Sequence, residues 1–194
     1  MKIVIIGCPR SGTLYTSKIF KASGLDVGHE KWGKDGIVSW FNTIEPLKCD
    51  YTLSTCRSNK IKKIDKREYI ILHQVRNPLK TIASMHSISN ISWDYVYKEL
   101  DISREKSCLY RCMQFWLMWN QKAEVHAYFT FRVENMDKEW PLIMRCMGTT
   151  NVFNKGYLGI HSRKHREVTW DDLYNEDEYL AKSIENKSRS YGYG

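Results

Sequence analysis

Short apolar runs alternate along this chain with segments in which apolar residues recur at helical spacing. The runs at 3–6 and 69–75 contain several β-branched residues, as buried parallel strands do. Three weaker strand patterns are found near 25–27, 50–56 and 126–133. Strands that alternate with helices predict one α/β domain over residues 1–194, with a mainly parallel sheet between two layers of helices.

The strongest helical pattern covers residues 104–124. One apolar stripe there contains Leu109, Cys112, Trp116, Trp119 and Ala123. The tryptophans of this stripe are expected in the core rather than in a ligand cage. Further helices are predicted after Ser11, after Asn77, after Thr169 and, as a surface helix, over 176–191.

Polar residues mark the starts of two of these helices. Asn77 is suited to a cap and Pro78 to the first helical position. Thr169 can cap another helix, with Asp172 at its third position. Two other segments carry weaker patterns: 31–42 is predicted to be a loop leading into a short helix, and 87–103 an excursion on the substrate side.

The segment from Gly7 to Gly12 joins the first predicted strand to the first predicted helix. A strand, a glycine-bearing turn and a helix aim several backbone N–H groups at one point, which binds a phosphate-like anion. The glycines have the P-loop spacing G-x-x-x-x-G-K-[ST], but Thr13 replaces the lysine and Leu14 the magnesium-holding hydroxyl. Arg10 supplies a fixed positive charge. The sequence predicts an anion site without magnesium; the alternative is a turn that only joins the two elements.

The overall charge points to anionic partners. The net charge of +8 favours nucleotides and sulfated or phosphorylated molecules, but no long run of Lys and Arg indicates nucleic acid. The first apolar run is too short for a signal peptide, and no stretch is long enough to span a membrane. We therefore expect a cytoplasmic protein without a membrane partner.

Six cysteines are spread along the chain without a C-x-x-C pair, at positions 8, 49, 56, 108, 112 and 146. Cys108 and Cys112 lie one helical turn apart, but the sequence offers no partner ligand close to them, so no metal site is predicted. Reduced and mostly buried thiols are expected in a cytosol.

Two segments together resemble the sulfotransferases that use 3′-phosphoadenosine 5′-phosphosulfate. The loop PRSGT at 9–13 is similar to the family's P-[KR]-S-G-T loop, which binds the 5′-phosphosulfate. Arg76, followed eight residues later by Ser84, is similar to the family's element for the 3′-phosphate. The segments FRVENM and SRKHREVTWDDL also look like parts of compact bacterial sulfotransferase-like proteins. The resemblance implies a three-layer fold of the P-loop type.

The same resemblance implies the residues that bind the donor. They are Arg10, Ser11, Gly12, Thr13, Leu14, Tyr15, Arg76, Ser84, Arg163 and Lys164. Tyr15 is expected either to stack on adenine or to pack in the core. Arg163 and Lys164 are carried over by position alone, because the glycine and aspartate-tryptophan motif near the family's carboxyl end is missing.

A catalytic base is implied less directly. The Lys-Thr-His of small-molecule sulfotransferases is replaced by TCR at 55–57, so the usual histidine base is absent. In branches that act on glycans a glutamate follows the second strand, and Glu30 matches that place, with His29 as a competitor. Glu30 is expected to take a proton from a hydroxyl or amine acceptor, either a small molecule or a glycan. Arg10 is expected to stabilise the departing phosphate, with no metal.

Two other classes of function remain open. A nucleotide kinase or NTPase with a degenerate P-loop would be favoured by a Walker lysine and by an acidic residue ending a strand, but the run at 69–75 ends without one. A non-catalytic member of the fold would bind an anionic nucleotide or a sulfated partner without needing Glu30.

Overall fold

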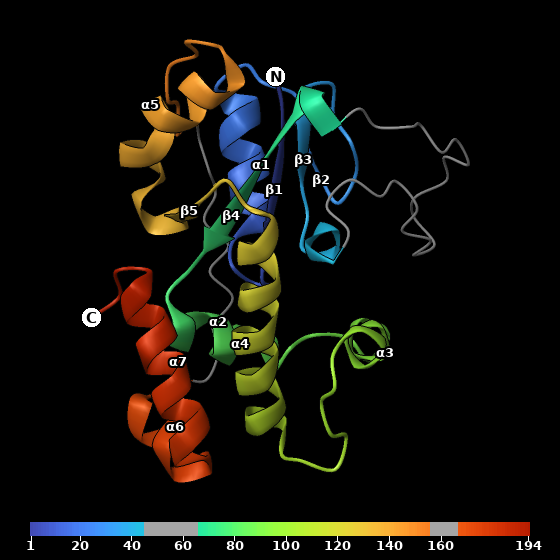
Figure 1. Cartoon of the computed structure of the whole chain (residues 1–194), viewed down its shortest axis with the longest axis vertical. Coiled ribbons are helices and arrows are strands. Elements are labelled where there is room, and N and C mark those ends of the chain that lie inside the picture. The colour runs from blue at the N-terminus through green and yellow to red at the C-terminus, as the bar shows by residue number, and fades with distance from the viewer. Residues whose placement is uncertain (45–65, 156–166) are drawn as a thin grey trace.

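The computed structural model describes residues 1–44, 66–155 and 167–194 of the chain. Five strands form one sheet in the order β2-β3-β1-β4-β5 (Figure 1). They are β1 (Lys2–Gly7), β2 (Val27–His29), β3 (Gly36–Val38), β4 (Tyr69–Val75) and β5 (Phe129–Arg132). Neighbouring strands are all parallel, so their carboxyl ends meet at one edge of the sheet.

Helices cover both faces of this sheet (Figure 1). The α-helices of the described residues are α1 (Thr13–Ala22), α2 (Pro78–Met85), α3 (Asn90–Glu99), α4 (Cys108–His126), α5 (Met136–Met147), α6 (Trp170–Glu176) and α7 (Glu178–Ser190). Short 3₁₀ turns lie at Phe41–Thr43, Lys66–Glu68 and Val133–Asn135. The predicted three-layer α/β architecture with a parallel sheet is confirmed.

One face of the sheet packs against α1 and α5. Ile3 and Ile5 of β1 and Leu72 of β4 are fully buried there, together with Phe20 of α1 and Trp140 of α5. The Phe20 and Trp140 rings lie 4.9 Å apart between centroids. Burying these large apolar side chains, at about 1.5–3 kcal/mol each, is what attaches both helices to the sheet.

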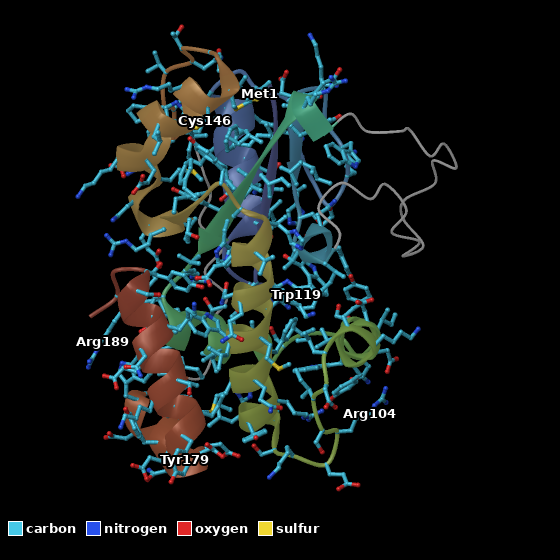
Figure 2. All side chains as sticks on the ribbon, viewed as in Figure 1. Met1, Arg104, Trp119, Cys146, Tyr179 and Arg189 are labelled. Carbon is cyan, nitrogen blue, oxygen red and sulfur yellow. The ribbon has the colours of Figure 1, made fainter. Side chains whose placement is uncertain are left out.

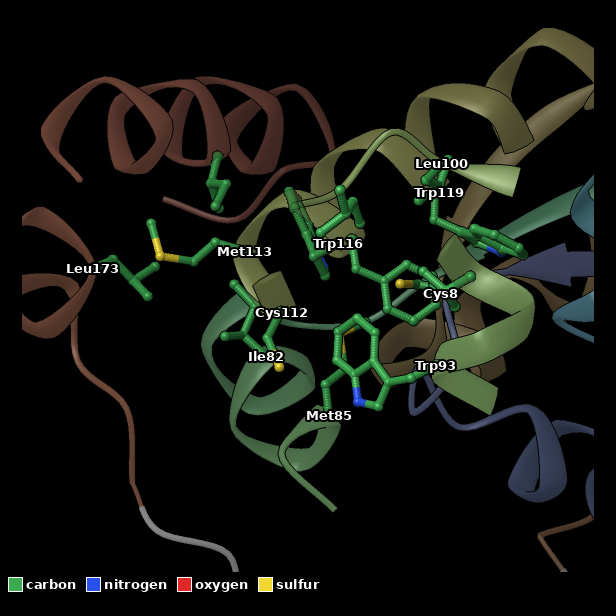
Figure 3. Packing of buried hydrophobic residues seen from close by; sticks show 14 of the residues in the cluster. Cys8, Ile82, Met85, Trp93, Leu100, Cys112, Met113, Trp116, Trp119 and Leu173 are labelled. Carbon is green, nitrogen blue, oxygen red and sulfur yellow. The ribbon is translucent and has the colours of Figure 1, made fainter. Parts of the chain in front are cut away.

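The other face packs against α4, which extends beyond the sheet. Ala123, near the end of α4, contacts Val4 and Ile6 of β1. The earlier part of α4 forms a separate apolar cluster with α2, α3, α6 and α7, and Figure 3 shows Trp116 and Trp119 inside it. This helical cluster supports the region just past the carboxyl ends of the strands.

A buried histidine fixes α4 to the sheet. His73 of β4 is fully buried, and its ring hydrogen-bonds to Asn120 of α4 at 3.0 Å and to Thr130 of β5 at 3.1 Å. The Asn120 amide nitrogen donates to the Trp116 carbonyl, so its oxygen accepts from His73 Nε2, and His73 Nδ1 accepts from Thr130. Burial lowers the pKa of His73 to about 4, which keeps the ring neutral at neutral pH.

Most strongly patterned elements occur where the sequence predicts them. The apolar runs form β1 and β4. The Asn77 side chain accepts from the Lys80 N–H at 3.1 Å and caps α2. Thr169 and Asp172 form a reciprocal capping box at the start of α6. Leu109 of the long helical stripe is only half-buried, whereas the other four stripe residues are buried.

Several expectations are corrected. The predicted loop at 31–42 contains β3, which is too short to show a sequence pattern. The helix predicted from residue 104 begins at Cys108, because the Ser107 side chain caps it. α5 was not predicted, since Pro141 is unfavourable inside a helix. The tail helix is not confined to the surface, because its Ile184 is fully buried.

Two further expectations concern loops. Residues 90–99 of the supposed excursion form α3, whose Trp93 and Val96 are buried against α4, so this segment has a structural role. A role in substrate binding stays a prediction. The strand expected at 50–56 lies outside the described residues.

The lowered pKa of His73 predicts how stability depends on pH. The unfolded histidine takes up a proton near pH 6.5, and the folded one only near pH 4. Falling pH therefore destabilises the folded state across this window, by up to about 3 kcal/mol. His73→Gln should remove this part of the pH dependence, as measured by urea unfolding at several pH values.

The control is His126→Gln, which changes an exposed histidine at the end of α4. Other titrating groups contribute equally to the unmodified protein and to both variants, so their contribution cancels when the pH dependences of stability are subtracted. An unchanged pH dependence in His73→Gln would show that the buried ring is not the group responsible.

Candidate functional site

The loop between β1 and α1 has the tight geometry that its sequence predicts. Arg10 and Gly12 both have left-handed backbones, with φ of 68° and 95°. This conformation suits Gly12, but for Arg10 it costs about 1 kcal/mol or more. Surrounding contacts must therefore hold Arg10 in place. Arg76 provides one of them, because its Nη1 donates to the Arg10 carbonyl at 3.0 Å.

Gln74 of β4 ties the loop to both neighbouring elements. Its fully buried side chain donates to the Ser11 carbonyl at 2.7 Å and accepts a short hydrogen bond from the Thr16 hydroxyl on α1. β1 and β4 also approach closely here, since a Cβ on Gly7 would lie 2.3 Å from the Gln74 carbonyl oxygen. Gln74 was not predicted as a site residue, although a polar amide inside the apolar run YIILHQV is a sequence signal for one.

The start of α1 is suited to an anion. Gly12 is its N-cap residue and has no side chain to accept hydrogen bonds from the first turn. In contrast, side chains cap α2, α3, α4, α6 and α7. The first turn of α1 also contains no acidic residue. Its backbone N–H groups and the positive end of the helix dipole therefore favour a negatively charged group at the loop.

The two segments that carry the sulfotransferase resemblance meet at this loop. Besides the Arg76 contact, the Arg10 guanidinium donates to the Ser87 carbonyl, just after α2, at 3.0 Å. Ser84 lies in the last turn of α2 and is 5% exposed, and its carbonyl accepts from the Ser87 hydroxyl at 2.9 Å. Arg10 is thus hydrogen-bonded directly to Arg76, which is 66 positions away in the sequence, and to Ser87, which is 77 positions away.

Glu30 and His29 lie beside the loop, at the end of β2. The Thr13 hydroxyl and His29 Nε2 share a hydrogen bond of 3.1 Å, and His29 Nε2 lies 3.6 Å from a Glu30 oxygen. The other Glu30 oxygen accepts from the Ser39 hydroxyl at 2.5 Å. The structure therefore connects the proposed base to the first helical residue after the loop. Neither the Thr13 nor the Ser39 contact was foreseen from the sequence.

The surroundings shift the pKa of both groups. Burial raises the pKa of Glu30 to about 7, although hydrogen bonds from Ser39 and from the Trp40 backbone oppose this shift. Burial lowers the pKa of His29, and the charge of Lys21 lowers it further. Near neutral pH, Glu30 therefore exchanges a proton readily while His29 stays neutral. The Glu30 side chain is 26% exposed, but its Oε1 atom has almost no solvent-accessible surface and its Oε2 atom accepts from Ser39.

For the remaining predicted site residues within the described ranges, the structure gives no contact that bears on donor binding. Leu14 is 52% exposed on the first turn of α1, where its side chain offers no metal ligand. Tyr15 packs at the margin of the α1–α5 core, as the packing alternative expects, and stays partly exposed. Stacking of Tyr15 on adenine remains a prediction. Arg163 and Lys164 lie outside the described residues.

No protein-family model matches the chain, and no match is found among curated proteins. The likeness to sulfotransferases therefore rests on the sequence motifs alone, and most closely on the loop with Arg76 and Ser84. Within the described residues, no helix combines the length and apolar character that crossing a membrane requires.

The role of Gln74 can be tested through stability. Gln74→Leu keeps the approximate volume but leaves the Thr16 hydroxyl and the Ser11 carbonyl unpaired, at a cost of about 2–4 kcal/mol. Adding Thr16→Val should recover about 1 kcal/mol or more, because it removes one unpaired group. Urea unfolding measures both effects.

Gln121→Leu, on the exposed side of α4, is the matched control and should change stability by less than about 0.5 kcal/mol. If Gln74→Leu were as mild as this control, or if Thr16→Val made it worse, Gln74 would not be the tie between strand, loop and helix.

Proposed function

We propose that this protein is a sulfotransferase that moves a sulfuryl group from 3′-phosphoadenosine 5′-phosphosulfate to a hydroxyl or amine acceptor. One observation carries the proposal: Arg76 and the end of α2 contact the glycine-bearing loop directly, through Arg10. Two segments that each resemble half of a donor site are thus in direct contact with each other near the carboxyl edge of the sheet.

In this proposal the two halves of the donor bind to different parts of the surface. The loop amides, the start of α1 and Arg10 bind the 5′-phosphosulfate. Arg76 and Ser84 bind the 3′-phosphate, with Arg76 forming charge-assisted hydrogen bonds. Such bonds are about twice as strong as neutral ones, so the 3′-phosphate should contribute much of the affinity.

Glu30 supplies the acid–base chemistry. The acceptor oxygen or nitrogen forms a bond to sulfur while the bond from sulfur to the bridging phosphate oxygen breaks. The acceptor's proton passes to Glu30, whose pKa of about 7 suits a general base near neutral pH. Arg10 and the loop amides stabilise the negative charge that grows on the departing phosphate.

A degenerate P-loop kinase or NTPase is the second candidate, supported by the spacing of Gly7 and Gly12. Two observations weigh against it. The exposed Leu14 stands where the magnesium-holding hydroxyl belongs, and the Thr13 hydroxyl is already bonded to His29. A non-catalytic nucleotide-binding protein is the third candidate, and the catalytic test below separates it from the first.

Nucleotide preference tests the proposed donor. By calorimetry, 3′-phosphoadenosine 5′-phosphate should bind more tightly than ADP or ATP, and a chelator should not weaken it. Arg76→Ala should weaken this binding by about 2 kcal/mol, or roughly thirtyfold. The same change should weaken adenosine 5′-phosphosulfate less, because this ligand lacks the 3′-phosphate and loses only the support that Arg76 gives to the loop through the Arg10 carbonyl.

Arg145→Ala, on the exposed side of α5, serves as the control for a lost positive charge. Preference for ATP with magnesium would support the kinase instead. Equal losses for both ligands in Arg76→Ala would make Arg76 a structural residue.

Turnover tests the proposed base, with an acceptor first found by screening hydroxyl and amine compounds against labelled donor. Glu30→Gln should lower turnover by about a hundredfold or more and leave donor binding nearly unchanged. In the unmodified protein, activity should rise with pH through about 7, since the base must be deprotonated. Ser39→Ala should move this rise to higher pH, because the Ser39 hydrogen bond lowers the pKa of Glu30.

His29→Ala is the control and should keep the pH-dependent rise. If Glu30→Gln stays active while His29→Ala loses activity, His29 is the base. Donor binding with no turnover for any acceptor, in the unmodified protein, would favour the non-catalytic candidate.

A further inference from the structure

Three side chains with soft or borderline metal-binding atoms converge away from the loop. His86 Nδ1 or Nε2 and the sulfur atoms of Cys108 and Cys112 all lie within 4.8 Å of one another. The sequence alone predicts no partner ligand for this cysteine pair, and the position of His86 corrects that expectation. His86 lies more than 20 positions before Cys108, so only the fold brings it close.

The packing of α2 against α4 creates this cluster. Ser107 caps α4, so Cys108 is its first residue and Cys112 follows one turn later on the same face. His86 is the C-cap residue of α2 and directly follows Met85. Figure 3 shows Cys112 next to Ile82 and Met85 of α2, and all three are fully buried in one cluster.

We propose that His86, Cys108 and Cys112 form a binding site for one thiophilic divalent cation, for which Zn²⁺ is the best fit. Two thiolates and an imidazole are a preferred ligand set of Zn²⁺, with a water or another external ligand in the fourth position. Around a tetrahedral zinc such atoms lie about 3.5–3.8 Å apart. The three ligand atoms all lie within 4.8 Å of one another, so binding requires them to approach by roughly 1 Å at most.

The burial of the three residues fits entry of an ion from solvent. His86 is exposed, Cys108 is half-buried and Cys112 is fully buried, so the site has an open side and a floor. On binding, both thiols release their protons to solvent, and two thiolates then balance the charge of the divalent ion. A site without net charge can sit against apolar neighbours such as Ile82 at little electrostatic cost.

This site is separate from the proposed donor site, and the inference does not depend on the sulfotransferase proposal. The two are nevertheless close in the chain. His86 precedes Ser87, whose carbonyl accepts the hydrogen bond from Arg10. A bound ion would tie the end of α2 to α4 and thereby hold Ser84 and Ser87 in place.

Titration of the reduced full-length chain with Co²⁺ tests the proposal, because thiolate-to-cobalt charge transfer gives a near-ultraviolet absorption band. We expect saturation at one equivalent, and loss of the band on addition of Zn²⁺. Cys108→Ser should remove about half of the band intensity. His86→Ala should weaken Co²⁺ binding by about a hundredfold, since even residues behind the ligands contribute ten- to hundredfold.

Both variants change residues that are at least partly exposed, so the fold should persist, and circular dichroism checks this. One control is Cys146→Ser, in the last turn of α5 and close to Met1 of the chain (Figure 2). The other is the double change Cys49→Ser/Cys56→Ser. These should leave the band unchanged. Absence of a thiolate band at stoichiometric Co²⁺ would overturn the proposal, as would a full band in Cys108→Ser or its loss in either control.

Discussion

The hydrogen bonds of Gln74 are the constraint on which the candidate site depends. One buried amide connects β4 to the Ser11 carbonyl in the loop and to Thr16 in α1. Because these partners are fully buried, the loss of one contact would leave a polar group without a partner. The loop is therefore fixed before any ligand binds, and Arg10 can be held in a left-handed conformation.

A fixed loop explains how distant segments act together. The strand ends bring Arg76 and Glu30 to the same edge of the sheet. The Ser87 carbonyl, just after α2, accepts from Arg10, and Ser84 lies in the last turn of α2. Each of these positions follows from parallel pairing and from the packing of α2 on α4. The chemistry proposed for Glu30 depends on the same frame, because burial at the sheet edge raises its pKa.

Sequence patterns predicted the strands and helix caps that depend on residues close together in the chain. They did not predict the strand and the side-chain contacts that depend on tertiary packing. The apolar runs of β1 and β4 and the cap at Asn77 have local causes, so they were found. β3 was missed because three residues carry no pattern and its pairing with β1 decides its conformation. The Thr13–His29 contact and the approach of His86 to Cys108 arise only when separate elements pack.

The central claim is that the loop and the end of α2 form one preformed anion site. Amide chemical shifts of the ¹⁵N-labelled chain, titrated with 3′-phosphoadenosine 5′-phosphate, test it most directly. The account predicts that the largest changes fall on residues 10–14 and 84–87, with little change in α6 and α7. Changes concentrated elsewhere, with the loop amides unaffected, would contradict it.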